Sequence, residues 1–182
     1  MIFNEEIYKD DKHSLDFNKS ITILRKAVRA IILNGDKILM VISGKTNEYK
    51  FPGGGIEKNE TIEEALKREV MEEIGYKVIK IKEKVGTITE YSIALEDKNK
   101  IFIMVSEYYS VKIDRNQIEQ KLDAYEEELL FKPNWTNIET AWKTNKRIID
   151  NKLDSTPWIK RETRVLELLM EIKITGKQAN CI

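Results

Sequence analysis

Residues 51–78 of this chain read FPGGGIEKNETIEEALKREVMEEIGYKV and contain its strongest helix signal. Within this stretch, residues 60–74 are rich in side chains of high helix propensity, and Gly75 supplies a stop signal. The glycines at positions 53–55 follow Pro52 and allow the backbone to approach a ligand closely. We therefore predict a glycine loop that leads directly into a helix over residues 60–74.

The predicted helix carries an uneven distribution of charge. Between Gly54 and Tyr76, seven acidic residues oppose three basic ones, although the whole chain balances 31 Lys and Arg against 31 Asp and Glu. At about 100° per residue, Glu69, Glu72 and Glu73 share an arc of about 100° that overlaps the apolar stripe of the helix. A helix that needed only solubility would place these carboxylates on the opposite face. Since unpaired buried carboxylates are costly, we predict that a cation binds at this arc.

The types of residue near this arc restrict which cation can bind there. The chain has one His, His13, and one Cys, Cys181, and neither is close to the helix in sequence. A ligand set made only of oxygen atoms is typical of the hard cations Mg²⁺ and Mn²⁺. The same two counts exclude an intrachain disulfide and a Cys cluster for zinc, and they argue against a His-based catalytic triad.

The overall composition restricts the class of protein. The formal net charge is zero, so the chain lacks the basic surplus that is typical of proteins that bind nucleic acid or anionic membranes. No apolar run approaches the roughly 20 residues that cross a bilayer, and residues 1–20 are polar and acidic, unlike a signal peptide. We predict a cytoplasmic protein with no membrane partner, for which nucleic acid is a disfavoured partner.

The rest of the chain predicts a mixture of strands and helices. Strands are expected over residues 21–33, 37–43, 49–56, 78–92, 99–113 and 130–136. The first two form a predicted hairpin, because Asn34-Gly35-Asp36 between them is a turn signal. Further helices are expected over residues 137–150 and 158–173. This order predicts an α+β fold or a mixed sheet with helices packed on it.

The segment from Gly54 to Tyr76 resembles the Nudix box, G-x5-E-x7-R-E-U-x-E-E-x-G-U, where U is an aliphatic residue. The residues that match in register are Gly54, Glu60, Arg68, Glu69, Val70, Glu72, Glu73 and Gly75. Tyr76 departs from the usual Ile, Leu or Val, which changes packing and leaves the chemistry intact. The resemblance implies an α/β (α+β) fold of the Nudix type, an α/β/α sandwich with a mixed sheet. We expect a Nudix domain over residues 21–150, an N-terminal extension over 1–20, and a C-terminal helix within 151–182 that packs on the domain.

Nudix enzymes hydrolyse a nucleoside diphosphate linked to another group, with divalent ions bound. By this resemblance, Glu69, Glu72 and Glu73 bind Mg²⁺ or Mn²⁺, and the carbonyl of Gly53 is a candidate further ligand. Alternatively, one of these glutamates, Glu69 or Glu73, acts as the base that deprotonates water instead of binding the metal. The sequence does not decide between the two residues. Arg68, beside them on the helix, is expected to orient a glutamate through a charge-assisted hydrogen bond.

Three further acidic residues, one in the motif and two in a later loop, have expected roles. Glu60 is expected to be structural, at the start of the helix, where a carboxylate favours the helix dipole. Many family members also use an acid from a loop ahead of a late strand, and here that loop is residues 123–128. Glu127 and Glu128 are the candidates for a metal ligand or base, and a solvated acidic loop is the alternative.

The substrate is less well determined than the family. By elimination of the marks of other subfamilies, we expect a MutT-type nucleoside triphosphate pyrophosphohydrolase. The alternatives are a hydrolase of dinucleoside polyphosphates or nucleotide sugars, a non-catalytic nucleotide sensor, and hydrolysis of RNA 5′ ends. Arg25 and Arg29 are candidates to face phosphates, and Tyr49 and Phe51 are candidates to stack on a base, with ordinary surface or core positions as alternatives. Apolar residues of the C-terminal helix predict either packing on the core or a homodimer contact: Val165, Leu166, Leu168 and Leu169.

Overall fold

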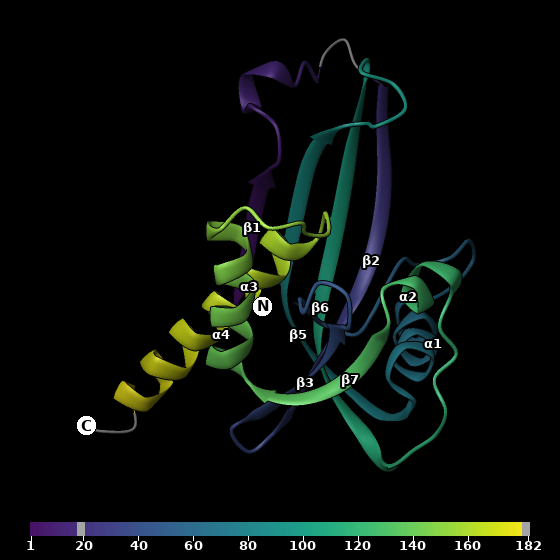
Figure 1. Ribbon diagram of the computed structural model, residues 1–182, viewed down its shortest axis with the longest axis vertical. Coiled ribbons are helices and arrows are strands. Elements are labelled where there is room, and N and C mark those ends of the chain that lie inside the picture. Colours follow the sequence, from purple (N-terminus) through teal and green to yellow (C-terminus); the bar gives the residue numbers. More distant parts are fainter. Residues whose placement is uncertain (18–20, 180–182) are drawn as a thin grey trace.

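The computed structural model describes residues 1–17 and 21–179, with the side chains of the last helix described to residue 172, so Cys181 lies outside the described residues. A seven-stranded sheet forms its centre, in the order β1-β5-β6-β2-β3-β4, with β7 paired to β3 (Figure 1). The sheet is mixed, because β1 is parallel to β5 and β2 to β6, whereas its other pairs are antiparallel. The strands are β1 (Phe3–Tyr8), β2 (Ile21–Asn34), β3 (Lys37–Ser43), β4 (Tyr49–Lys50), β5 (Tyr76–Ile93), β6 (Lys100–Gln117) and β7 (Phe131–Asn137).

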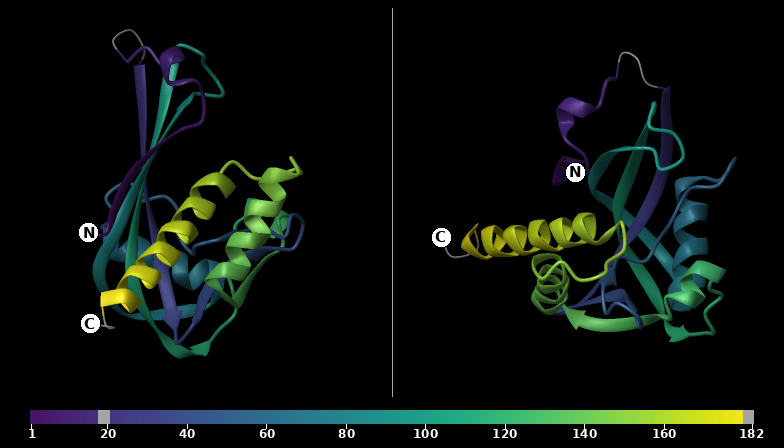
Figure 2. Two further views of the ribbon diagram at one scale, coloured as in Figure 1. Left: turned by 90° about the vertical axis from the view of Figure 1, so that its left-hand side faces the viewer. Right: turned by 45° about the horizontal axis from the view of Figure 1, so that its top comes forward.

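Helices cover both faces of the sheet. Helix α1 (Ile62–Ile74) lies on one side with the short helix α2 (Ala124–Glu128), whereas α3 (Ile138–Asp150) and α4 (Ile159–Ala179) lie together on the other (Figures 1 and 2). A short 3-10 helix (Lys12–Ser14) contains His13, which is exposed. The expected α/β/α sandwich with a mixed sheet is confirmed.

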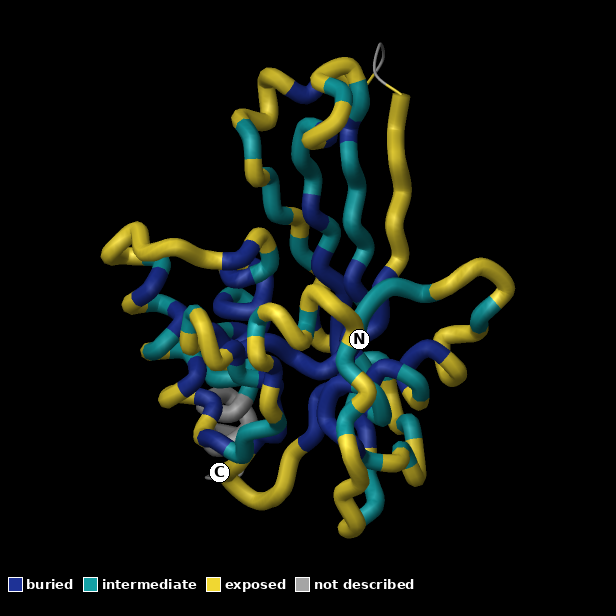
Figure 3. Tube along the Cα trace, turned by 45° about the vertical axis from the view of Figure 1, so that its right-hand side comes forward, coloured by how far each residue is buried: buried dark blue, intermediate teal, exposed yellow. Residues whose placement is uncertain are grey.

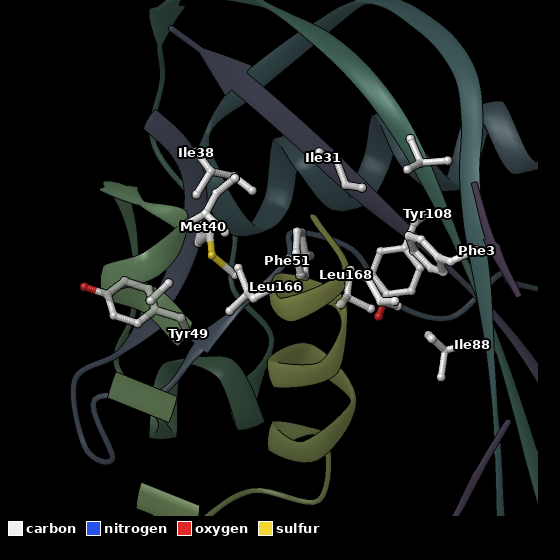
Figure 4. Close-up of a cluster of buried hydrophobic side chains, with 14 residues drawn as sticks. Phe3, Ile31, Ile38, Met40, Tyr49, Phe51, Ile88, Tyr108, Leu166 and Leu168 are labelled. Carbon is white, nitrogen blue, oxygen red and sulfur yellow. The ribbon is translucent and has the colours of Figure 1, made fainter. Parts of the chain in front are cut away.

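The alternation of strand residues divides the core into two clusters. Val28 and Ala30 of β2 join a cluster with Leu66 of α1. Ile31, whose side chain lies on the other face of β2, joins a second cluster with Val165 of α4. Figure 4 shows this second cluster, in which Phe51, Tyr108 and Leu166 lie close together. Successive residues of β2 therefore face opposite helices, and the polar residue Arg29 belongs to the α4 side.

Several local boundaries differ from the expectations for physical reasons. Helix α1 begins at Ile62 because Thr61 caps it and forms a capping box with Glu64. The expected strand over 49–56 is reduced to two residues, because the chain turns at Pro52 into the glycine loop. Residues 124–128 form a helix instead of a loop, with Asp123 as its cap. Helix α1 ends as expected at Gly75, which adopts a left-handed conformation with φ of 71°.

The C-terminal helix packs within the chain. Val165, Leu166 and Leu168 are buried in the same cluster as Phe51, so these side chains serve the core of this chain. Tyr49 and Phe51 are also buried there, so they occupy core positions, which was the stated alternative to stacking on a base. The division of the chain at residues 20 and 150 stays a prediction.

One end of the sheet extends beyond the helices. The first six residues of β2, Ile21–Lys26, are all exposed, and β5 and β6 run beside them (Figure 3). Phe102 and Met104 of β6 pair with Ile23 and Arg25 of β2 in this region. This end of the sheet therefore lies next to the glycine loop.

Candidate active site

Helix α1 places two of its glutamates on the buried side. Glu69 is 8% exposed and Glu73 is 1% exposed, and they lie among the buried apolar residues of the helix. The predicted overlap of the carboxylate arc with the apolar stripe is therefore confirmed for these two residues. Glu72 lies at the edge of the arc, and its side chain is 37% exposed.

Arg68 connects several parts of the glycine-helix segment. Its guanidinium donates hydrogen bonds of 2.8 and 2.9 Å to both carboxylate oxygens of Glu60. It also donates to Oε1 of Glu69 at 2.8 Å and to Oε2 of Glu72 at 3.2 Å. A further bond of 3.0 Å reaches the carbonyl of Gly55. The hydrogen bond from Arg68 lowers the pKa of Glu60, so this carboxylate is an ionised structural partner. Glu60 precedes the helix cap and acts on the helix through Arg68.

The glycine loop touches both buried glutamates. The amide of Gly53 donates a hydrogen bond of 2.7 Å to Oε2 of Glu73. A side chain at Gly53, with φ of 136°, would place its Cβ 2.1 Å from the carbonyl oxygen of Val28. A Cβ at Gly54 would lie 2.5 Å from the Glu69 carboxylate. The loop can contact the helix this closely only because these residues are glycines. The role of the Gly53 carbonyl as a metal ligand stays a prediction, since the contact to Glu73 is made by the amide.

Three carboxylates from two helices meet beside the loop. Glu69, Glu73 and Glu126 each offer an oxygen atom, and these atoms lie within 4.8 Å of one another. We call these residues the carboxylate cluster. Glu72 lies outside it, hydrogen-bonded to Arg68. The structure thus joins two of the three predicted helix ligands and adds a third residue from α2.

The structure places the two loop acids expected from the sequence outside the carboxylate cluster. Glu128 is exposed and forms an ion pair of 3.2 Å with Lys45, and Glu127 is exposed as well. Glu126 lies in the cluster instead, because the segment forms a helical turn that directs this residue toward α1. The sequence held a usable signal, since Asp123 and Glu126 have the spacing of a capping box, which indicates a helix.

The electrostatics of the carboxylate cluster show an excess of negative charge. Burial raises the pKa of Glu73 to about 7. Burial and the charge of Glu73 raise the pKa of Glu69. Lys50 is buried and pairs with Glu73, and its charge opposes part of this shift. Three like charges converge here. They face Lys50 and a guanidinium, Arg68, that Glu60 and Glu72 also share, so the donor set fits a divalent cation held by oxygen atoms.

A cleft of about 560 Å³ opens beside the carboxylate cluster. The cations Arg25, Arg29 and Lys50 line it together with the glycine loop, and Tyr125 and Trp158 add aromatic surface. The expectation that Arg25 and Arg29 face the site is therefore consistent with their positions. The cleft combines basic and aromatic side chains, which suits a phosphorylated molecule with a planar ring system.

A second group of charges, buried except for Lys9, lies on the α4 side of the cleft. Arg161 donates to Oε1 of Glu162 at 2.7 Å and to Oε2 of Glu90. Lys9 lies 2.9 Å from the other oxygen of Glu90, and Glu162 accepts the amide hydrogen of Phe51 at 3.0 Å. This group ties β1, β5 and α4 to the segment that precedes the glycine loop.

Among the described residues, no helix is both long enough and apolar enough to pass through a membrane.

Comparison with known proteins gives a family and a fold. The NUDIX domain model matches residues 23–156. An 8-oxo-dGTP diphosphatase of Buchnera aphidicola is 54% identical over 37 residues, which are 20% of this chain and 30% of that protein. The solution structure of the E. coli ORF135 protein superposes with a TM-score of 0.52 at 21% identity, over 82% of this chain and 91% of that one. A MutT NUDIX hydrolase from Burkholderia pseudomallei gives 0.49 at 17% identity, over 64% and 85% of the two chains.

Proposed function

The chain belongs to the Nudix family, and on that premise we propose that it is a MutT-type enzyme that hydrolyses a nucleoside triphosphate to the monophosphate and pyrophosphate. Membership makes it a pyrophosphohydrolase of the class that acts on small nucleotide substrates with divalent metal ions. We propose the triphosphate as substrate, the identity of the metal and the roles of individual residues.

The carboxylate cluster at the edge of the cleft carries this proposal. Its three oxygen atoms converge within 4.8 Å, and two of its members are almost fully buried. Carboxylates alone would repel an anionic substrate, so a site of this kind favours nucleotides only when a cation is bound. The cluster beside a cleft with basic residues therefore supports metal-dependent attack on a phosphate group.

Mg²⁺ or Mn²⁺ is the proposed metal, with Glu69, Glu73 and Glu126 as the residues that would hold it. When bound, such an ion neutralises phosphate oxygens and lowers the pKa of a water molecule. The protein prepares its ligands in advance: Arg68 fixes Glu69, and Gly53 and Lys50 fix Glu73. Glu69 and Glu73 both remain candidates for the base that accepts the proton of the attacking water.

The choice of a nucleoside triphosphate rests on two observations. The 37-residue likeness to an 8-oxo-dGTP diphosphatase favours a nucleoside triphosphate, although it spans less than a third of that protein. The cleft volume of about 560 Å³ falls in the range of small-molecule sites, and Tyr125 and Trp158 are placed where a nucleobase can stack. Trp158 lies just beyond the matched domain, so the C-terminal segment contributes to the substrate site.

A substrate panel tests the proposal. The purified protein is incubated with Mg²⁺ or Mn²⁺ and with nucleoside triphosphates, dinucleoside polyphosphates, nucleotide sugars and capped RNA, with EDTA as the metal-free control. We expect the highest kcat/KM for a nucleoside triphosphate, release of pyrophosphate, and no turnover in EDTA. A preference for another member of the panel would replace the substrate assignment. Nucleotide binding without turnover under either metal would instead identify a non-catalytic sensor.

A further inference from the structure

Arg29 of β2 is a buried cation that forms no ion pair within 4.0 Å among the described residues. It is 7% exposed and lines the cleft beside Lys50 and Glu73. Its Nε atom is buried and has no hydrogen-bond partner. In the part of the chain that the structure describes, no carboxylate lies within 4.0 Å of its guanidinium.

The other buried cations of the cleft are compensated. Arg161, 3% exposed, is held between Glu90 and Glu162, and Lys50 is paired with Glu73. The charge of Arg29 reaches Glu73 strongly enough to lower its pKa, but the oxygens of Glu73 already accept from Lys50 and from the Gly53 amide. Within 4.0 Å the ion-pair partner of Glu73 is Lys50, and the attraction between Glu73 and Arg29 acts at longer range.

An uncompensated arginine at this depth requires a physical explanation. A guanidinium remains charged under all ordinary conditions, so it cannot avoid the cost of burial by losing a proton. Burying an unpaired charge lowers the stability of the folded protein. A residue of this kind is expected where an anion from outside the protein completes the pair.

The position of Arg29 determines where that anion would lie. Val28 and Ala30 face α1, so Arg29 points to the opposite side of β2, into the cleft. The glycine loop packs directly on its backbone, since a Cβ at Gly53 would lie 2.9 Å from the Arg29 Cα atom. Arg25, four residues earlier on the same side, is exposed at the rim of the cleft beside Gly55. Arg29 is thus the inner cation of a basic row that ends at the carboxylate cluster.

We propose that Arg29 binds a phosphate group of the substrate directly, through a forked pair of guanidinium hydrogen bonds. The inference rests on the proposed function insofar as the phosphate belongs to a nucleotide. Planar guanidinium groups match two phosphate oxygens at once, which a lysine cannot do. Arg29 is therefore a substrate-binding residue that sets the affinity for the pyrophosphate part of the substrate, and it lowers the stability of the protein when no ligand is present.

The test compares Arg29→Met and Arg29→Lys with the wild type, and uses Arg161→Met as a matched control for loss of a buried arginine. Two measurements are made on each protein: thermal unfolding without ligand, and calorimetric binding of inorganic pyrophosphate in the presence of Mg²⁺. We expect Arg29→Met to bind pyrophosphate at least about 10-fold more weakly, since it loses two charge-assisted hydrogen bonds. Its melting temperature should stay level or rise by about 2–4 °C, because an unpaired buried charge is removed. Arg161→Met should melt at a lower temperature.

The binding measurement separates this inference from the proposed function. Unchanged pyrophosphate affinity in Arg29→Met, with nucleoside triphosphate turnover intact in the wild type, would overturn the role of Arg29 alone. Weaker pyrophosphate binding in a protein that turns over no nucleotide would support Arg29 and reject the proposed function. If Arg29→Met fails to fold, the affinity of Arg29→Lys decides, with an expected loss because a lysine contacts one oxygen at a time.

Discussion

The buried charges on the α4 side of the cleft are balanced within the protein, whereas those around the glycine loop are not. Arg161 and Lys9 face Glu90 and Glu162, so two positive groups meet two negative ones. Glu162 of this group also accepts a hydrogen bond from the Phe51 amide. Charges paired in this way hold β1, β5 and α4 together without a ligand.

The carboxylate cluster shows the opposite condition. Its three acids share Lys50 and Arg68, and Arg29 lies nearby without an ion pair within 4.0 Å among the described residues. These positive charges offset the cluster only in part, because burial and repulsion between the carboxylates still raise the pKa values of Glu69 and Glu73. This contrast indicates that buried charges belong to a functional site when the protein leaves them unbalanced. Buried charges that the protein balances have a structural role.

Breaking the balanced group should have the largest effect on stability. Arg161→Met leaves Glu90 and Glu162 without their main partner in a buried position. We expect a loss of about 3–5 kcal/mol in the free energy of unfolding, measured by chemical denaturation. The control is Arg164→Met, because Arg164 pairs with Glu5 at a partly exposed position and should cost less than about 1 kcal/mol. Equal, small losses for the two variants would show that the group around Arg161 is not structural.

The unbalanced cluster should make stability depend on pH. The folded-state pKa of Glu73, raised to about 7, exceeds the ordinary value near 4.5, so the folded protein binds more protons between these values. In metal-free protein the contribution of Glu73 to stability is therefore present below about pH 4.5 and is lost as pH rises through about 7. The change is at most about 3 kcal/mol.

Unfolding curves at pH 5 and pH 8 in EDTA, for the wild type and Glu73→Gln, measure this change. The wild type should lose more stability than the variant between the two pH values. Added Mg²⁺ should stabilise the wild type more at pH 8, where the carboxylates are ionised and ready to bind it. Identical pH dependence in both proteins would contradict the burial of an ionisable Glu73.

Removing one charge from the carboxylate cluster should chiefly affect catalysis. Glu73→Gln is expected to lower kcat at least about 100-fold, or about 2.7 kcal/mol, with the fold intact, because it weakens the proposed metal site. Glu63→Gln on the same helix is the control, since Glu63 is exposed and pairs only with Lys67. A Glu73→Gln enzyme with near-normal kcat would remove Glu73 from the site.

The smallest effect on catalysis is expected at α2, where Glu126 and Glu128 should behave differently. Glu126→Gln should lower kcat about 10-fold and weaken Mg²⁺ binding, whereas Glu128→Gln should change neither. The two residues are two positions apart, but only Glu126 points to Glu69 and Glu73. Calorimetric titration with Mg²⁺ and steady-state kinetics measure the difference, and equal losses in the two variants would reject the assignment of Glu126.

The features that the sequence determined by itself are local. Helical periodicity was enough to place Glu69 and Glu73 on the buried side of α1, because the angle between residues of one helix is fixed by its own hydrogen bonds. Gly75 ended the helix and Gly35 closed the β2–β3 hairpin for equally local reasons. The resemblance of one 23-residue segment then implied the family and the sandwich fold.

Which distant residues complete the site depends on how the segments of the chain pack together. Glu126 joins the carboxylate cluster, and Glu72 leaves it, because of how α2 and the glycine loop pack against α1. Arg29 and Phe51 looked like equivalent candidates in sequence, but one lines the cleft and the other fills the core. Contacts between segments far apart in the chain depend on packing that no local pattern encodes. For that reason the helix residues were predictable and their partners were not.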